Sequence, residues 1–438
     1  MNILIITTWF PPDTTIAAVR PYMFAKYLRK AGHDVTVLRS GAIHIKIDGN
    51  AYPELDIKVC SYMGENSEAE RYRRGEPIQA PSVRKRRAAF LPDRIRKALI
   101  WVYECINGSF DIFRRLQEAK NRFKLQKAWI DENRNQNYDV VFSTCGELEN
   151  IYAGKYAAEV FGCKWILDFR DPIAQKLWDN LWEYPIMKRI QKKAILSADV
   201  CTAVSVGLAE EISNGTDKDI ITLYNGFDTV AREATPTPED GILRFCYTGI
   251  MYKYRSPSSL FCAIKQLADT GKLDLKNIRF EYAGPDFDMI LAQAKPYGVE
   301  EILIDHGYVS RTEAYEIQCR SDIFLVLSWN TKLEQGVLTG KFYEGIRAKK
   351  PILSLLTGDK PDSDLNLLNK KYNYGFCYET CQEKVHFPAL LDWLETAYTC
   401  KQAGQPIPYH PEPGLFTDFC YSNLSQKLEK IMLEMTQE

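Results

Sequence analysis

Short apolar runs rich in isoleucine and valine recur along the chain, and segments with helical spacing separate them. In the first half the runs are Asn2–Thr8, Asp34–Leu38, Asp139–Ser143, Lys164–Asp168, Val200–Val204 and Ile220–Leu223. Continuous apolar runs of this length are typical of parallel strands covered on both faces. The segments with apolar residues at three- and four-residue spacing are Ala17–Ala31, Glu147–Phe161 and Trp182–Ser197. Strand and helix in alternation predict an α/β protein with a doubly wound sheet.

The alternation is interrupted once and then resumes. Residues Ala234–Gly241, rich in Pro and Thr, are typical of a linker. The strands expected after it are Leu243–Tyr247, Arg279–Tyr282, Ile302–Ile304, Ile323–Leu327, Ile352–Leu355 and Gly375–Tyr378. We therefore expect two tandem Rossmann-like domains, residues 1–235 and 241–410, facing a central cleft at the carboxyl ends of their strands. Residues 411–438 should form a C-terminal amphipathic helix, Thr417–Met435, packing back on the first domain.

Composition excludes several functional classes. The chain has 438 residues with 56 Lys and Arg against 57 Asp and Glu, a balance that argues against a nucleic-acid binder. The 5 His have no Cys or carboxylate at ligand spacing, so a zinc catalyst is not expected. The 12 scattered Cys are typical of reduced, buried thiols, and no apolar run reaches the roughly 18 residues that span a bilayer. The sequence predicts a cytoplasmic enzyme.

The loop after the first strand, Trp9–Ala17, contains no glycine. Dinucleotide-binding loops need glycines so that the backbone can approach a pyrophosphate. This argues against a nicotinamide or flavin enzyme, and no P-loop string occurs elsewhere.

The segment Gly336–Leu353 is the most informative. A helix is expected to open at about Thr339, and the free N–H groups of a helix start bind anions. Lys341 adds a positive charge, and Glu344 lies on the same helix face. A phosphate on Lys341 and a pair of sugar hydroxyls on Glu344 would suit a nucleotide diphosphate. The alternative is an ordinary surface ion pair.

Two further loops carry charge at the ends of expected strands. Tyr247–Pro257 contains a glycine turn at Gly249 and then Arg255, which could face the same phosphates. In the first domain, Asp168, Arg170 and Asp171 follow a strand, where charges face the cleft in this architecture. A solvated loop cation for Arg255, and a loop-holding ion pair for Arg170, remain alternatives.

Two other patterns have competing interpretations. Asp286 with Asp288 and Asp362 with Asp364 match a short metal-binding string, but aspartates at helix starts are commonly caps. The basic run Arg71–Lys97 precedes an aromatic stretch, Ala98–Phe113. It indicates either a patch that binds an anionic membrane surface or a solvated loop that leads into a core helix.

Taken in order, several strings resemble the family 4 glycosyltransferases, which have the GT-B fold, over nearly the whole chain. They are Ile3–Pro12, Gly32–Val37, Asp168–Pro172, Tyr224–Asp228, Tyr247–Gly249, Gly307–Ser310 and Gly340–Glu344. The resemblance implies transfer of a sugar from a nucleotide diphosphate sugar to an acceptor hydroxyl, with retained configuration, without metal or other cofactor, in glycan or cell-surface polysaccharide assembly.

The resemblance also implies residue roles. Arg255 and Lys341 would be catalytic by neutralising the diphosphate, and Glu344 would bind the donor ribose. The donor-binding set is Gly249, Arg255, Gly340, Lys341 and Glu344. The acceptor-side or cleft set is Thr14, Thr15, Arg20, Asp168, Arg170 and Asp171. The acceptor would be a glycan or a lipid-linked molecule. With a lipid-linked acceptor, the protein would bind peripherally to the inner face of the membrane.

The chain departs from the family pattern at two places. The family commonly has a glycine pair in the first loop, where this chain has Thr14 and Thr15, and an earlier Glu eight positions before the ribose Glu, where it has Gly336. The nearest acid is Glu334. A non-catalytic nucleotide-sugar binder and a nucleotide-sugar isomerase on the same fold stay open as alternatives.

Overall fold

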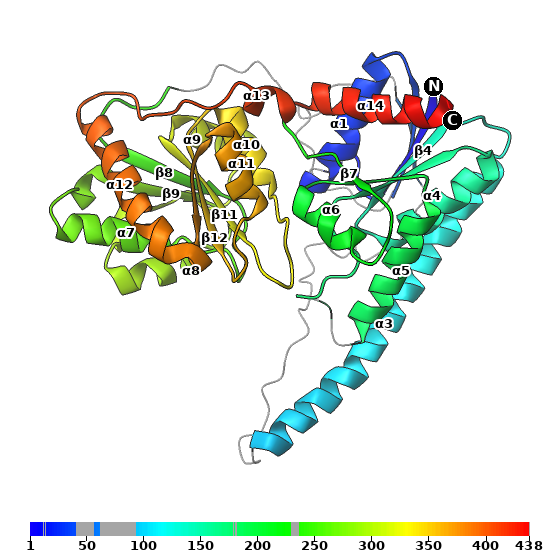
Figure 1. Ribbon diagram of the computed structural model, residues 1–438, viewed down its shortest axis with the longest axis horizontal. Coiled ribbons are helices and arrows are strands. Elements are labelled where there is room, and N and C mark those ends of the chain that lie inside the picture. Colours follow the sequence, from blue (N-terminus) through cyan, green and yellow to red (C-terminus); the bar gives the residue numbers. More distant parts are fainter. Residues whose placement is uncertain are drawn as a thin grey trace. The chain divides into compact units, whose positions relative to one another are not determined.

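The computed structural model describes residues 1–11, 13, 15–40, 57–61, 93–177, 179, 182–228 and 236–437, with the backbone alone for 93–111. The chain divides into two compact units. The first comprises Met1–Val204, Leu208–Leu223 and Ser425–Glu438, and the second comprises Ser205–Gly207 and Tyr224–Leu424. Each unit is built on its own parallel sheet (Figure 1).

The sheet of the first unit has seven strands among the described residues, in the order β3-β2-β1-β4-β5-β6-β7. The strands are β1 (Asn2–Thr7), β2 (Asp34–Arg39), β3 (Lys58–Ser61), β4 (Val140–Cys145), β5 (Lys164–Phe169), β6 (Val200–Ala203) and β7 (Ile220–Thr222). All neighbouring pairs are parallel. The winding direction reverses between β1 and β4, and ligands of open α/β sheets bind at such a reversal.

The helices that connect these strands are α1 (Ile16–Lys30), α3 (Asp93–Glu132), α4 (Leu148–Phe161), α5 (Glu183–Ser197) and α6 (Val206–Ser213). The C-terminal helix is α14 (Tyr421–Gln437). The 40-residue α3, cyan in Figure 1, packs along α4, where Phe123 lies edge-on to Tyr152 and Tyr156. The Ser425–Glu438 part of α14 joins this unit, and Glu429 lies 2.8 Å from His33.

The second unit repeats the same strand order. Its six described strands run β10-β9-β8-β11-β12-β13, all parallel. They are β8 (Leu243–Thr248), β9 (Ile278–Ala283), β10 (Leu303–Asp305), β11 (Ile323–Trp329), β12 (Ile352–Thr357) and β13 (Gly375–Glu379). Here the winding reverses between β8 and β11. All seven residues of β11 are buried, as expected for a central strand covered on both faces.

The helices of the second unit are α7 (Ser258–Asp269), α8 (Phe287–Ala294), α9 (Arg311–Arg320), α10 (Gly340–Ala348), α11 (Asp364–Tyr372), α12 (Glu383–Gln402) and α13 (Gly414–Asp418). Short 3-10 turns, η1 (Leu275–Asn277), η2 (Lys295–Tyr297), η3 (Glu300–Ile302) and η4 (Thr380–Gln382), join some of them. Phe419, fully buried, packs against Phe342, Tyr343 and Tyr372 and so ties the segment before α14 to this unit.

The predicted α/β architecture of two Rossmann-like units is confirmed, and every strand expected from an apolar run is present within one or two residues. Residues 236–241 contain no helix or strand, and they lie within the second unit, whose long segment begins at Tyr224. The edge strand β3 was not predicted, because it is short and largely exposed. The length of α3 was not predicted either, since Asn107, Gly108 and Ser109 are weak helix formers.

Candidate functional site

The donor-side residues predicted from the sequence lie at the winding reversal of the second unit, between β8 and β11. Strand β8 ends at Thr248, and Gly249 follows with φ 125°, a backbone conformation that favours glycine. A Cβ on Gly249 would lie 2.9 Å from Cε of Lys341. The glycine therefore lets the Lys341 side chain cross the end of β8.

Helix α10 begins where the sequence predicted, with Thr339 in the extended N-cap conformation and Gly340 as its first residue. The Thr339 side chain makes no capping bond to the helix, and its buried Oγ1 has no hydrogen-bond partner among the described residues. The N–H groups of a first helical turn lack intrahelical acceptors, and the helix dipole makes them favourable to an anion. This helix start can therefore accept a phosphate.

Lys341 and Glu344 form a close ion pair one turn into α10. Nζ of Lys341 lies 2.9 and 2.7 Å from the two carboxylate oxygens of Glu344. Both side chains keep about a fifth of their surface exposed, 23% and 22%. The ordinary ion pair that spacing alone indicated is thus present, and it lies at the strand ends where a ligand can reach it.

Two further residues hold this pair in place. Gln318 of α9 is buried and donates from Nε2 to Glu344 at 2.7 Å and to Oγ1 of Thr248 at 2.8 Å. Nζ of Lys341 also lies 3.4 Å from the same Thr248 oxygen. Gln318 was not predicted from the sequence, because no local motif distinguishes it from other polar residues of a helix.

Arg255 lies in the loop after β8 and is fixed by its guanidinium. Nη1 donates to the carbonyl of Ile250 at 2.9 Å and to the hydroxyl of Tyr247 at 3.3 Å. The guanidinium also stacks over the ring of Tyr252, 4.5 Å from its centre. Burial raises the pKa of the Tyr247 hydroxyl, Arg255 opposes that rise and Glu344 adds to it. Arg255 contacts Tyr247 and Lys341 contacts Thr248, so both cations lie at the carboxyl end of β8.

Glu334, the acid nearest to the missing family position, is buried in the loop before α10. Its carboxylate accepts from the indole N–H of Trp329 at 2.9 Å, and 9% of the residue is exposed. Gly336, at the family position itself, lies two residues further along and accepts from the hydroxyl of Ser205 through its carbonyl. One carboxylate oxygen of Glu334 is thus engaged by the last residue of β11.

In the first unit, Arg20 and Asp168 form a buried, two-point ion pair at the carboxyl end of β5. Nε and Nη2 of Arg20 donate to the Asp168 carboxylate at 2.9 and 2.7 Å, and the two side chains are 2% and 0% exposed. Thr202 and the carbonyl of Leu223 complete the network. The expectation that Arg20 and Asp168 line an open cleft is not met, since both side chains point into the interior.

Arg170 lies at the winding reversal of the first unit beside Glu147, which was not predicted from the sequence. Its Nη2 is 3.6 Å from the carboxylate of Glu147, which also accepts from the indole of Trp9 at 2.7 Å. Nη1 donates to the carbonyl of Ala17 at 3.2 Å. Arg170 therefore forms an ion pair with Glu147, as the alternative interpretation predicted. Glu147 lies two residues after the end of β4, so the rule that charges gather at strand ends could have found it.

The remaining acceptor-side residues are less informative. Asp171 is exposed directly after Arg170, and the half-buried Thr15 is the N-cap of α1 without a side-chain capping bond. Thr14 lies outside the described residues.

Three of the four aspartates in the short acidic strings have structural partners. Asp286 accepts from the backbone N–H of Met251 at 2.9 Å, and Asp364 accepts from the N–H groups of Val206 and Gly207. Lys370 pairs with Asp362 at 2.9 Å. Within the described parts of the chain, no three His, Cys, Asp or Glu side chains gather as a metal site would require.

Most of the basic run Arg71–Lys97 falls outside the described residues, and its last five residues form the start of α3 with the backbone alone described. Among the helices in the described ranges, none combines the length and the apolar character needed to cross a bilayer. The proposed contact of this run with a membrane stays a prediction.

Solved structures share the fold over the whole length. The lipopolysaccharide outer core galactosyltransferase WaaB, in its apo form, matches with a TM-score of 0.59 and 14% identity, covering 99% of this chain and 100% of that one. Anabaena Alr3699/HepE in complex with UDP and glucose matches with a TM-score of 0.58 and 12% identity, over 99% and 100%. A trehalose-6-phosphate protein from E. coli, bound with UDP-2-fluoro glucose, matches with 0.60 and 11%, over 100% and 99%. No family model and no curated protein matches the sequence.

At these identities the likeness establishes the fold. The chain has the two-unit GT-B architecture of these proteins from end to end, as the resemblance in the sequence implied.

Proposed function

We propose that this protein is a retaining glycosyltransferase, similar to family 4, that transfers a hexose from a nucleotide diphosphate sugar to an acceptor hydroxyl in glycan assembly. The observation that carries the proposal is the grouping of Lys341, Glu344 and Arg255 at the β8–β11 reversal, beside the start of α10. WaaB is a galactosyltransferase, and HepE was solved with UDP and with UDP-glucose. A UDP-sugar is therefore the first donor to test.

The chemistry follows from charge. Breaking the bond between sugar and diphosphate leaves negative charge on the departing phosphate oxygens. Lys341, Arg255 and the first N–H groups of α10 supply positive charge and donors where that charge grows. This arrangement favours the transition state over the bound donor and so accelerates bond breaking.

Donor binding should rearrange the Lys341–Glu344 pair. Glu344 neutralises the ammonium of Lys341. A diphosphate would attract Lys341 toward itself and free one carboxylate oxygen to accept from the ribose hydroxyls. Gln318 would keep Glu344 in position during this exchange, because it bonds the carboxylate from the neighbouring helix.

The acceptor is expected on the first unit, where Trp9, Glu147 and Arg170 lie at the corresponding strand ends. Carboxylate, guanidinium and indole groups suit the hydroxyls and the apolar face of a sugar.

A thermal-shift screen against UDP-glucose, UDP-galactose, UDP-N-acetylglucosamine, GDP-mannose and ADP-glucose tests the proposal. A ligand that binds only the folded state raises the unfolding temperature. Wild type should respond to one nucleotide sugar and to its free diphosphate, and Lys341→Ala should respond weakly. Lys370→Ala, which removes a lysine from an exposed pair with Asp362 in the same unit, is the matched control.

Turnover separates the alternatives. Release of nucleotide diphosphate that depends on an added acceptor supports a transferase. Conversion of the donor without acceptor would favour an isomerase, and a thermal shift without any turnover would favour a binding protein. No shift with any nucleotide sugar would contradict the proposal.

A further inference from the structure

Helix α5 of the first unit presents four cations on one exposed face. Lys188, Arg189, Lys192 and Lys193 are all exposed, and none of them makes an ion pair among the described residues. The opposite face of the helix is buried through Met187, Gln191, Ala194 and Ile195. The spacing of three and four residues places the cations together on the outer face. These four cations, called the α5 strip below, therefore have no acidic partner among the described residues.

Apolar side chains accompany these cations on the same outer face. The exposed fractions are 48% for Trp182, 41% for Ile186 and 57% for Leu196. The acid of this helix, Glu183, points elsewhere and pairs with Arg115 at 2.6 Å. Cations and large apolar groups side by side suit a lipid surface, where the cations meet anionic headgroups and the apolar groups enter the interface.

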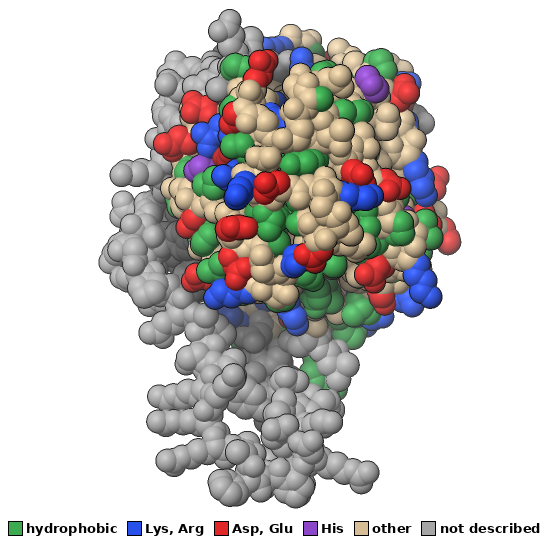
Figure 2. All heavy atoms as spheres, turned by 90° about the vertical axis from the view of Figure 1, so that its left-hand side faces the viewer, with side chains coloured by type: hydrophobic (Ala, Val, Ile, Leu, Met, Phe, Trp, Pro, Cys, Tyr) green, Lys and Arg blue, Asp and Glu red, His purple; other side chains and the backbone are tan. Residues whose placement is uncertain are grey.

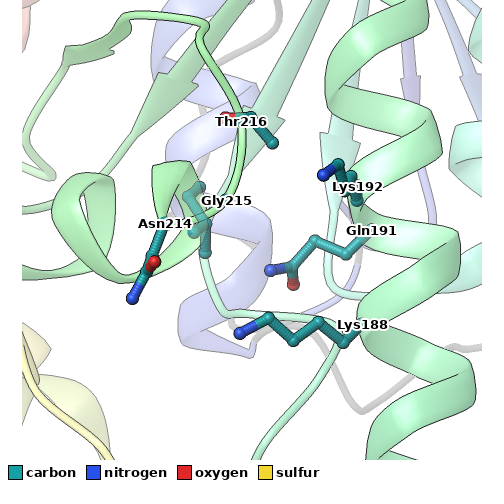
Figure 3. Close-up of a pocket in the computed structure, with 7 residues that line it drawn as sticks. Lys188, Gln191, Lys192, Asn214, Gly215 and Thr216 are labelled. Atoms are coloured by element: carbon teal, nitrogen blue, oxygen red, sulfur yellow. The ribbon is translucent and has the colours of Figure 1, made fainter.

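A small cavity of about 170 Å³ adjoins this strip. It lies between α5 and the segment after α6, and its lining includes Lys188, Gln191, Lys192, Asn214 and Thr216. Figure 3 shows Lys188 and Gln191 extending from α5 toward Asn214 and Gly215.

Gln191 is oriented by the backbone. Its carboxamide oxygen accepts from the N–H groups of Ile173 and Ala174 at 2.8 and 3.3 Å, and 5% of the residue is exposed. The oxygen is thus directed into the unit, and the amide nitrogen faces the cavity (Figure 3). An amide donor between two ammonium groups matches the oxygens of a phosphate headgroup.

The distribution of charge on α5 differs from that on another surface of the molecule. On the face in Figure 2, basic and acidic side chains are interspersed. In the second unit, pairs such as Lys272 with Glu395 and Lys265 with Asp269 neutralise one another. The α5 strip has no such acids.

We infer that the outer face of α5 docks on an anionic lipid surface, with a lipid phosphate seated in the cavity between α5 and residues 214–216. This contact is separate from the donor site and does not depend on the proposed glycosyl transfer. It also differs from the contact predicted for Arg71–Lys97, because it uses described residues of another helix.

Vesicle flotation with the full chain tests the inference. Vesicles of phosphatidylcholine with about one third phosphatidylglycerol should carry wild type upward at low salt, and pure phosphatidylcholine should not. Binding should weaken at high salt, because screening shortens the attraction to about a nanometre. Since each basic group strengthens such binding several-fold, replacing all four cations of α5 by Glu should lower the partition coefficient by roughly a hundredfold or more.

A matched control changes four exposed lysines elsewhere to Glu and alters net charge equally. These are Lys276, Lys295, Lys384 and Lys427. This control should float like wild type. The double variant Trp182→Ser with Ile186→Ser should leave salt-sensitive binding but reduce what remains at high salt. Unfolding temperatures of all variants show whether each one is folded.

Three outcomes would overturn the inference. The first is absence of wild type from anionic vesicles at low salt. The second is equal flotation of the α5 variant and wild type, which would transfer the contact to another surface such as Arg71–Lys97. The third is an α5 variant that still binds vesicles but no longer binds duplex DNA as wild type does. This result would assign the strip to nucleic-acid binding.

Discussion

The two units share one strand order, yet they use charge at the carboxyl ends of their strands in opposite ways. In the first unit, Arg20 and Asp168 are fully buried and bonded at two points. In the second unit, Lys341 and Glu344 are equally close but partly exposed, at a helix start with an unpartnered Thr339 hydroxyl. Asp168 lies at the end of a strand and the other three lie in helices that follow strands, so local sequence does not tell the two pairs apart. Burial therefore distinguishes an ion pair that stabilises the interior from an ion pair that a ligand can reach.

The largest expected effect is on the stability of the first unit. Asp168→Ala leaves the guanidinium of Arg20 buried without its anion, and Thr202 also loses its acceptor. Breaking a buried pair from one side costs about 3–5 kcal/mol. Urea unfolding should show this loss in the free energy of unfolding. If Arg20→Met with Asp168→Leu is no more stable than Asp168→Ala, the unpaired charge is not the cause.

The second prediction concerns Lys341 in the second unit. Lys341→Ala should lower kcat about a hundredfold, the usual order for one group that stabilises developing charge. It should weaken donor binding less, because the phosphate charge is larger in the transition state. Its free energy of unfolding should change by less than about 1 kcal/mol, since partly exposed pairs contribute little. A near-normal kcat would instead indicate that the Lys341–Glu344 pair has a structural role, as the Arg20–Asp168 pair does.

The third prediction concerns its partner. Glu344→Gln keeps the shape of the side chain but weakens a charge-assisted bond, so binding of the nucleotide diphosphate should weaken roughly tenfold. The ribose contact acts on the ground state and the transition state alike, so kcat should change little. Isothermal titration with UDP measures this, with Glu395→Gln, from the pair with Lys272, as control. Equal affinity in wild type and Glu344→Gln would give Glu344 a structural role.

The smallest effect tests a second buried acid of the first unit. Burial raises the pKa of Glu149 above its ordinary 4.5, and Arg122 only partly opposes the rise. The folded state therefore favours the protonated acid. This contribution is complete below the ordinary pKa and is lost as pH rises through the folded value. Glu149→Gln should flatten the pH dependence of unfolding free energy between acidic and neutral pH. An unchanged profile would assign that dependence to other groups.

Much of the fold was predictable because its signals are local. Apolar runs such as Ile323–Leu327 are continuous since central parallel strands are covered on both faces, and the start of α10 near Thr339 follows from a strand, a loop and a helical pattern. Lys341 and Glu344 could be found for the same reason, since three residues along one helix are always neighbours.

The sequence by itself therefore determined the two α/β halves and the charged residues at the ends of their strands. Only the tertiary structure decided which charges are accessible, because burial depends on residues far away in the chain. Asp168 meets Arg20 across 148 positions, and Gln318 reaches Glu344 from another helix. No local pattern encodes such distances. The packing of the sheets buried one pair and left the other partly exposed, where we propose that a phosphate binds.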